Sequence, residues 1–330
     1  MILCEYKQFE VRAFSRICKK YVYLVYLMRW LLISCVLLFT FFTNCQKEVE
    51  IQINGNKTPK YDDVPTIHVE NYINRLFIDL LGREPTDTER DSLTKKLKDS
   101  QLSTLCRDSI VYDLQWDTTY RVGDSSYRHA YIQRVYNLLK FNYVEGASDP
   151  EIGQKLGNLR FAINVSRLNG DSVRVKQYLA EAQKYENILR WKYNYRKANS
   201  TYPALCGYLM YNGVYDVINM GSFNFVNAAF DDVLGRNPTK QEFDAAYAVV
   251  DKNEPTIVFN KVASNKLEFI SILTESDAFY EAQVRWWYFQ YLRKEIPSDQ
   301  LFVWTKEYHN NKKVEWFQRQ ILITDEYAQF

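Results

Sequence analysis

Apolar residues recur every three or four positions along most of the chain, a spacing that predicts α-helices. In residues 72–81 the apolar side chains share one face of such a helix: Tyr72, Ile73, Leu76, Phe77, Leu80 and Leu81. Gly82 follows them directly, where a left-handed residue commonly ends a helix. Pro85 prevents continuation, and Thr86 with Glu89 has the spacing of a capping box. The segment therefore predicts a helix, a tight turn and a second helix.

The same helix–turn–helix pattern occurs a second time along the chain. Residues 72–89 read YINRLFIDLLGREPTDTE and residues 225–242 read FVNAAFDDVLGRNPTKQE, with nine of the eighteen aligned residues identical. The second copy repeats each role at the turn, and the matching pairs are Asp79 and Asp232, Gly82 and Gly235, Arg83 and Arg236, Pro85 and Pro238, Thr86 and Thr239, and Glu89 and Glu242. An internal repeat of this kind predicts stacked units of similar structure.

A third, degenerate copy is predicted from Val284 onward. The sequence VRWWYFQYLRKEIPSDQL keeps the apolar helix and Pro297, offers Ser298 as a cap, and lacks the glycine. The segments that close the second and third units, residues 276–279 and 324–327, also correspond.

Helical patterning also fills the region between the first two copies, so the chain is predicted to be all-α, a bundle or array of repeated helix–turn–helix modules. The predicted organisation is a leader over residues 1–44, an extended tether over 45–66, a first module over 67–126, a central helical segment over 127–221, a second module over 222–280 and the degenerate third module over 281–330.

The N-terminal region has the pattern of an export signal. Leu31–Thr43 is an uncharged run that ends just before Cys45, and it is shorter than the ~20 residues of a membrane-spanning helix. Met28-Arg29-Trp30 precedes the run, so we expect translation to start at Met28. The alternative is a signal anchor over residues 21–43.

Three resemblances to known families follow from these motifs. MRWLLISCVLLFTFFTNC resembles a bacterial lipoprotein signal, which implies a lipid on Cys45 and attachment to the outer membrane. Gln46-Lys47-Glu48 is similar to a surface-export signal of Bacteroidota lipoproteins, which implies display on the cell surface. The Leu-Gly-Arg segments, proline turns and closing segments resemble phycobilisome-linker-like helical domains. That likeness implies scaffolding or attachment to protein partners.

The charge balance indicates which partners to expect, and the cysteine content indicates whether a disulfide can form. Residues 45–330 carry 36 basic and 38 acidic side chains, so nucleic acid is not expected as a partner. Removal of the leader leaves Cys106 and Cys206 in addition to Cys45. We expect these two either to pair as a disulfide in an oxidising compartment or to remain buried thiols.

No metal or cofactor is predicted. The three histidines, His68, His129 and His309, have no second histidine or carboxylate at zinc-motif spacing, and no phosphate-binding or nucleophile motif occurs.

Three functions are compatible with these patterns. The favoured one is a non-enzymatic scaffold for protein partners at the envelope. The second is a glycan-binding accessory protein, suggested by the aromatic content and the run Trp286-Trp287-Tyr288. The third is a hydrolase that uses the duplicated acids Asp79, Asp232, Glu89 and Glu242. Capping explains both glutamates, and helix-end pairing with Arg83 and Arg236 would explain both aspartates.

Overall fold

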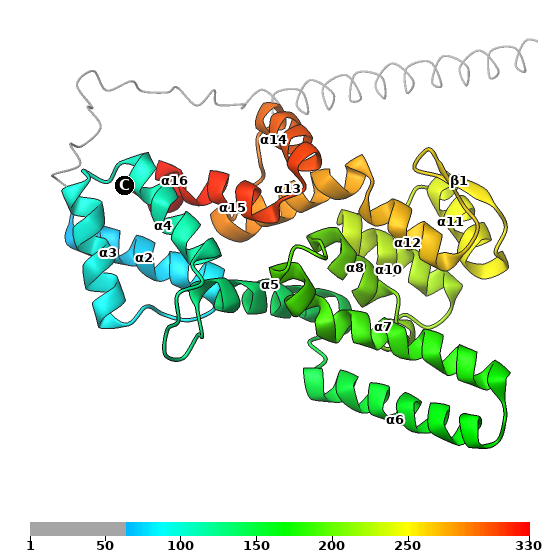
Figure 1. Ribbon diagram of the computed structural model, residues 1–330. Helices are drawn as coiled ribbons and strands as arrows, with labels where there is room; N and C mark the ends of the chain where they lie inside the picture. The colour runs from blue at the N-terminus through cyan, green and yellow to red at the C-terminus, as the bar shows by residue number, and fades with distance from the viewer. Residues whose placement is uncertain (1–63) are drawn as a thin grey trace, which may run out of the picture. The chain divides into compact units, whose positions relative to one another are not determined.

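The computed structural model describes residues 64–330 (Figure 1). The predicted leader, the predicted lipidation site Cys45 and all but the end of the predicted tether lie outside these residues. The described residues form fifteen α-helices and one two-stranded hairpin, which confirms the predicted all-α class.

Each predicted copy of the repeat forms its own group of helices. The first contains α2 (Thr66–Leu81), α3 (Asp87–Asp99) and α4 (Thr104–Trp116). The second contains α10 (Ser222–Leu234), α11 (Lys240–Lys252), strands β1 (Thr256–Val258) and β2 (Lys261–Ala263), and α12 (Lys266–Thr274). The third contains α13 (Asp277–Leu292), α14 (Ser298–Asn311), α15 (Val314–Leu322) and α16 (Asp325–Ala328).

The turn between the first two helices is the same in all three groups. Gly82, Gly235 and Arg293 each end a helix in the left-handed conformation, with φ of 75°, 63° and 56°. The next helix begins five residues later each time. Arg293 therefore replaces the missing glycine. The predicted cap at Ser298 is wrong: Pro297 holds the cap position, and because proline has no side-chain acceptor, α14 lacks a side-chain cap.

The closing segments correspond as predicted. Ser276 caps α13 by accepting a hydrogen bond from the amide of Phe279, and Thr324 caps α16 by accepting one from the amide of Tyr327. The hairpin of β1 and β2 was not anticipated. The run Thr256-Ile257-Val258 is rich in the β-branched residues that strands favour, and it pairs antiparallel with β2.

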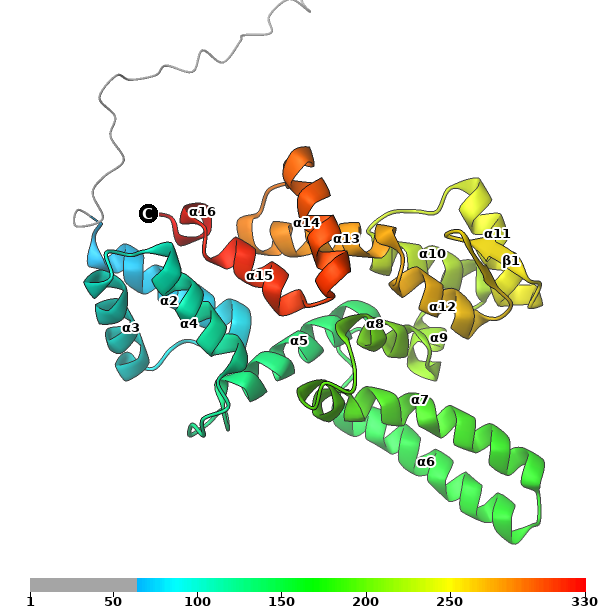
Figure 2. The ribbon, with the colours of Figure 1, turned by 45° about the horizontal axis from the view of Figure 1, so that its top comes forward.

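The central segment contains α5 (Tyr127–Val144), α6 (Asp149–Leu168), α7 (Ser172–Arg196), α8 (Tyr202–Met210) and α9 (Gly213–Ile218). Helices α6 and α7 form a long antiparallel hairpin that projects from the other helices (Figure 2). Their apolar side chains are partly exposed: Phe161 of α6 is 71% and Leu179 of α7 is 45% exposed. The reason is that α6 packs mainly on α7, so only one face of α6 is covered.

The third module packs against the first. The Tyr72 hydroxyl of α2 donates a hydrogen bond to the carbonyl of Leu322 at 3.1 Å, and Arg75 donates to the carbonyls of Tyr327 and Tyr291 at 2.7 and 3.2 Å. These bonds join residues from opposite ends of the described chain.

Candidate functional site

The first turn holds its predicted polar residues in one hydrogen-bonded network. Thr86 and Glu89 form the capping box. The guanidinium of Arg83 donates two hydrogen bonds to the Glu89 carboxylate, both of 2.9 Å, and two more to Asp124. Burial raises the pKa of Glu89, but the hydrogen bonds from Arg83, Thr86 and Tyr127 outweigh it and lower that pKa to about 2. The buried ring of Pro85 precedes the cap.

The second turn repeats the arrangement with fewer partners. Thr239 and Glu242 form the capping box, with Pro238 half-buried before it. Arg236 donates to Glu242 at 2.8 and 2.6 Å, and these hydrogen bonds lower the pKa of Glu242 to about 2. The arginines therefore bind the capping glutamates. The predicted pairing of Arg83 and Arg236 with the aspartates is wrong, because each guanidinium points across the turn instead of back along its helix.

Each repeat aspartate is bound by a tyrosine that the sequence interpretation missed. The Asp79 carboxylate accepts a hydrogen bond from Tyr327 at 2.7 Å, and Asp232 accepts one from Tyr215, also at 2.7 Å. Both tyrosines stand three residues after a helix cap, Thr324 and Asn212 respectively. That spacing was visible in the sequence, but nothing in it indicated which helix the hydroxyl would reach.

The duplicated acids do not form one four-carboxylate site. Helices α2 and α10 lie at opposite ends of the helical array in both ribbon views (Figures 1 and 2). Within residues 64–330, no group of three or more His, Cys, Asp or Glu side chains could hold a metal ion. Each glutamate instead forms the capping box of its own turn, and each aspartate accepts a hydrogen bond from a tyrosine.

The aromatic run on α13 contributes to packing. Trp287 is 1% and Tyr288 3% exposed, and Trp286 is half-buried with its ring edge-on to Trp287 at 4.5 Å. No flat, exposed aromatic platform is present on this helix turn.

Cys106 and Cys206 are free thiols, so the disulfide alternative is wrong for this structure. The Cys106 thiol on α4 is half-buried and faces the carbonyl of Lys96. Cys206 is fully buried on α8 next to Tyr143, and burial raises its pKa to about 12. The two side chains thus have separate neighbours.

The three histidines also differ from one another in the residues around them. The ring of His309 stacks on Tyr280 and lies 2.6 Å from the Asp277 carboxylate. Burial, followed by the charges of Arg196 and Lys192, lowers the pKa of His129. His68 lies in the first turn of α2.

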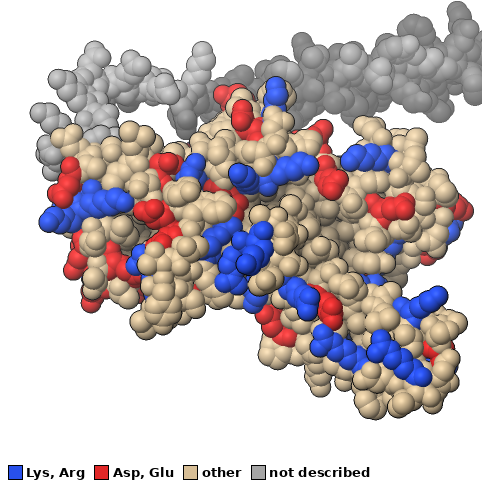
Figure 3. Space-filling model, in the orientation of Figure 1, with Lys and Arg blue, Asp and Glu red and all other residues tan. Residues whose placement is uncertain are grey.

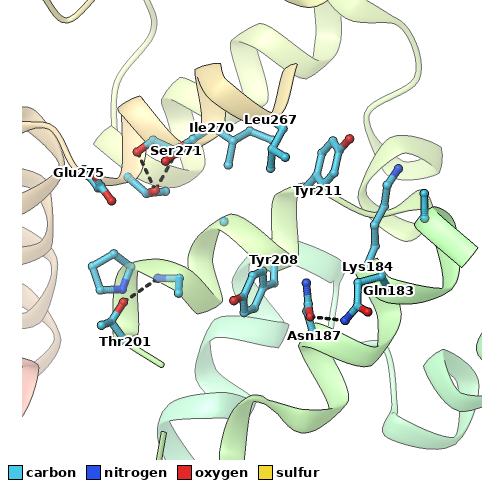
Figure 4. Close-up of a pocket in the computed structure, with 15 residues that line it drawn as sticks. Gln183, Lys184, Asn187, Thr201, Tyr208, Tyr211, Leu267, Ile270, Ser271 and Glu275 are labelled. Carbon is cyan, nitrogen blue, oxygen red and sulfur yellow. Dashed lines mark hydrogen bonds between the residues drawn. The ribbon is translucent and has the colours of Figure 1, made fainter. Parts of the chain in front are cut away.

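A well-formed recess with a mainly apolar lining lies between α7, α8 and α12 and forms a groove (Figure 4). Its volume is about 520 Å³. Tyr208 of α8 and Tyr211, which directly follows that helix, lie between Leu267 and Ile270 of α12 and the polar side chains of α7 (Figure 4). Both tyrosines are half-buried, and Leu267 is 51% exposed. Apolar surface of this kind, rimmed by polar groups, is typical of a binding site.

Polar residues fix the α7 side of this groove. Gln183 donates to the Asn187 side chain at 2.8 Å, and Lys184 pairs with Glu181 at 2.7 Å while its ammonium lies 4.3 Å from the centre of the Tyr211 ring. The hydroxyls of Tyr208 and Tyr211 make no hydrogen bond to any other described residue. The groove thus offers an apolar floor and two tyrosine hydroxyls to a ligand.

The charged surface has no dominant sign. Figure 3 shows acidic and basic side chains interspersed over one face, between wide neutral areas. Within residues 64–330, no helix has the length and apolar character required to span a bilayer.

Comparison of the chain with protein-family models, curated proteins and solved structures finds no match.

Proposed function

We propose that this chain is a non-enzymatic interaction protein of the bacterial envelope, exported and held at the outer membrane by a lipid on Cys45, and that it binds a protein partner in the α7–α8–α12 groove. Surface display would follow from the Gln46-Lys47-Glu48 signal. The resemblance of the repeat to phycobilisome-linker-like domains supports the same role.

The groove is the observation that carries this proposal. Its floor combines a half-exposed leucine with two half-buried tyrosines whose hydroxyls are free, and tyrosine is enriched where protein partners bind. A partner segment with an apolar face and one or two hydrogen-bonding groups fits this chemistry.

The turn glutamates support a non-catalytic role. Each glutamate of the turns is engaged by an arginine and a helix cap, and each repeat aspartate accepts a tyrosine hydroxyl. Low glutamate pKa values suit permanent ion pairs, whereas a general acid or base requires a pKa near the working pH.

Site-specific photo-crosslinking tests the groove. A photoreactive phenylalanine analogue replaces Leu267 in the full chain, and the matched control carries it at Leu168, which is 88% exposed on α6 outside the groove. After irradiation of cells and purification from solubilised membranes, we expect one stoichiometric protein to be crosslinked at Leu267 and not at Leu168.

A groove-filling variant adds an independent measurement. Ala204→Trp places a large ring in the groove, and Leu168→Trp adds the same bulk elsewhere. We expect only Ala204→Trp to reduce partner recovery. Equal recovery from both variants, or no partner in any purification, would overturn the proposal.

Labelling with radioactive palmitate tests the anchor separately. We expect the wild-type chain to incorporate label and Cys45→Ala to incorporate none. An unlabelled wild-type chain would refute lipidation while leaving the groove experiment valid.

A further inference from the structure

A second, smaller pocket lies between α5, α10 and α13, with a volume of about 360 Å³. Its lining includes two residues that are identical in both copies of the repeat, Asp232 and Gly235, together with the neighbouring Asp231. Trp286 of α13 and Tyr143 of α5 also line it. The first module shows how the protein fills the equivalent position.

In the first module, arginines surround the repeat aspartate. Burial raises the pKa of Asp79, and the charges of Arg75, Arg134 and Arg293 oppose that rise. The Arg134 side chain lies directly over the turn, since a Cβ atom added to Gly82 would be 3.1 Å from its Cδ. The aliphatic stem of this arginine therefore covers the glycine, and its positive charge acts on the aspartate.

In the second module, no such cation is present. No Lys, Arg or His side chain lines the pocket, and a Cβ atom added to Gly235 would meet nothing within 4 Å. Asp232 accepts its hydrogen bond from the uncharged Tyr215, and the negative charge of Asp231 acts on it. The space covered by an arginine stem in the first module is thus an open pocket in the second.

A buried polar group adds a second, independent indication of a ligand. Tyr143 is 3% exposed, and its hydroxyl has no nitrogen or oxygen partner, only the weakly accepting thiol of Cys206 beside it. A buried hydroxyl without a good partner is costly, and a ligand or water in the adjoining pocket would relieve that cost.

We propose that this pocket binds an organic cation, a guanidinium or ammonium group on a short apolar stem. Asp232 and Asp231 supply the opposite charge, and the half-buried ring of Trp286 supplies an aromatic wall for cation–π contact and stem packing. The bound cation takes the role that Arg134 has in the first module. This inference does not rest on the partner-binding groove, because its test uses the purified chain alone.

Calorimetric titration of the full chain with N-acetyl-arginine methylamide tests the proposal. The neutral control ligand is N-acetyl-citrulline methylamide, which has nearly the same shape without the charge. We expect arginine to bind about tenfold or more tightly than citrulline, because a charge-assisted pair is stronger than a neutral hydrogen bond. Equal affinities for the two compounds would overturn the proposal.

Two matched variants locate the site. Asp232→Asn removes the charge and keeps an oxygen for Tyr215, so we expect it to lose the preference for arginine over citrulline. Asp79→Asn makes the same change in the first module, where the arginines are internal, and we expect it to bind like wild type. If both variants bind arginine like wild type, or both lose it, the proposed site is wrong. Melting curves confirm that each variant is folded.

A third arm distinguishes the source of the cation. A peptide with one arginine between apolar residues represents a protein partner, and the capped amino acid represents a small molecule. Tighter binding of the peptide assigns the pocket to a partner's side chain, and equal binding assigns it to a free cation. Either result supports cation binding, whereas failure of both probes to bind overturns it.

Discussion

The first and second modules share nine of eighteen residues across the turn, yet their surroundings differ. In the first module, Arg83 binds both Glu89 and Asp124, and Arg134 of α5 covers Gly82. In the second module, Arg236 binds Glu242 alone, and Gly235 borders an open pocket. The repeat sequence therefore fixes the backbone of the turn, and neighbouring helices decide whether its surface is filled or left open to a ligand.

Alanine substitution of the two turn arginines provides the largest expected contrast. Arg83→Ala leaves Glu89 and Asp124, with side chains 14% and 13% exposed, without their cation. We expect a loss of about 1–3 kcal/mol in the free energy of unfolding. Arg236→Ala removes a more exposed pair and is expected to cost roughly 1 kcal/mol or less. Urea denaturation measures both, and equal losses would contradict the contrast.

Alanine substitution of the two turn glycines is expected to lower stability by different amounts, because their surroundings differ. A Cβ atom at φ near +60° to +75° costs roughly 1–2 kcal/mol, so Gly82→Ala and Gly235→Ala should both destabilise the fold. Gly82→Ala should cost more, because the Arg134 side chain must also move. Thermal unfolding compares the two. A larger loss for Gly235→Ala would contradict the open space beside Gly235.

Both repeat aspartates have a raised folded pKa, so ionisation of either one destabilises the fold as the pH rises. Burial raises the pKa of Asp232 to about 6, with a further increase from Asp231, and the groups facing it from α9, α5 and α13 are Tyr215, Tyr143 and the uncharged Gln283. Because the folded pKa exceeds the unfolded value of about 4, ionisation of Asp232 destabilises the fold above pH 6. At pH 8, Asp232→Asn should therefore be more stable than wild type by about 1 kcal/mol.

Repeating the denaturation at lower pH checks the sign. As the pH falls from 6 toward 4, the wild-type carboxyl becomes protonated in the folded state, so the advantage of Asp232→Asn over wild type should disappear. An advantage that persists at pH 4 would show that the substitution acts through packing instead of charge.

The third turn offers the smallest expected effect. Arg293 occupies the left-handed position that glycine holds in the other two turns. Arg293→Gly should relieve backbone strain and stabilise the protein by up to about 1 kcal/mol. Part of this gain is lost, because the variant also removes the positive charge of Arg293 near Asp79. Arg293→Ala separates the two contributions, because it removes the charge and retains the strain. A glycine variant no more stable than the alanine variant would refute the strain argument.

Much of the fold could be predicted from local pattern. The turn lengths, both capping boxes and the caps at Ser276 and Thr324 follow from residues close together in the chain. The errors arose where distant segments meet. Nothing near Asp79 in the sequence indicates that Tyr327 reaches it, and the exposure of Phe161 depends on which helices leave α6 uncovered.

The sequence by itself determined the helical class, the repeated turn and the residues that build it, because helix caps and left-handed turn residues act over three to six positions. Only the tertiary structure decided that one copy of the turn is covered by an arginine stem while the other opens into a pocket, and that α7, α8 and α12 enclose a groove. The physical reason is that cavities and the neutralisation of charge depend on side chains brought together from distant parts of the chain.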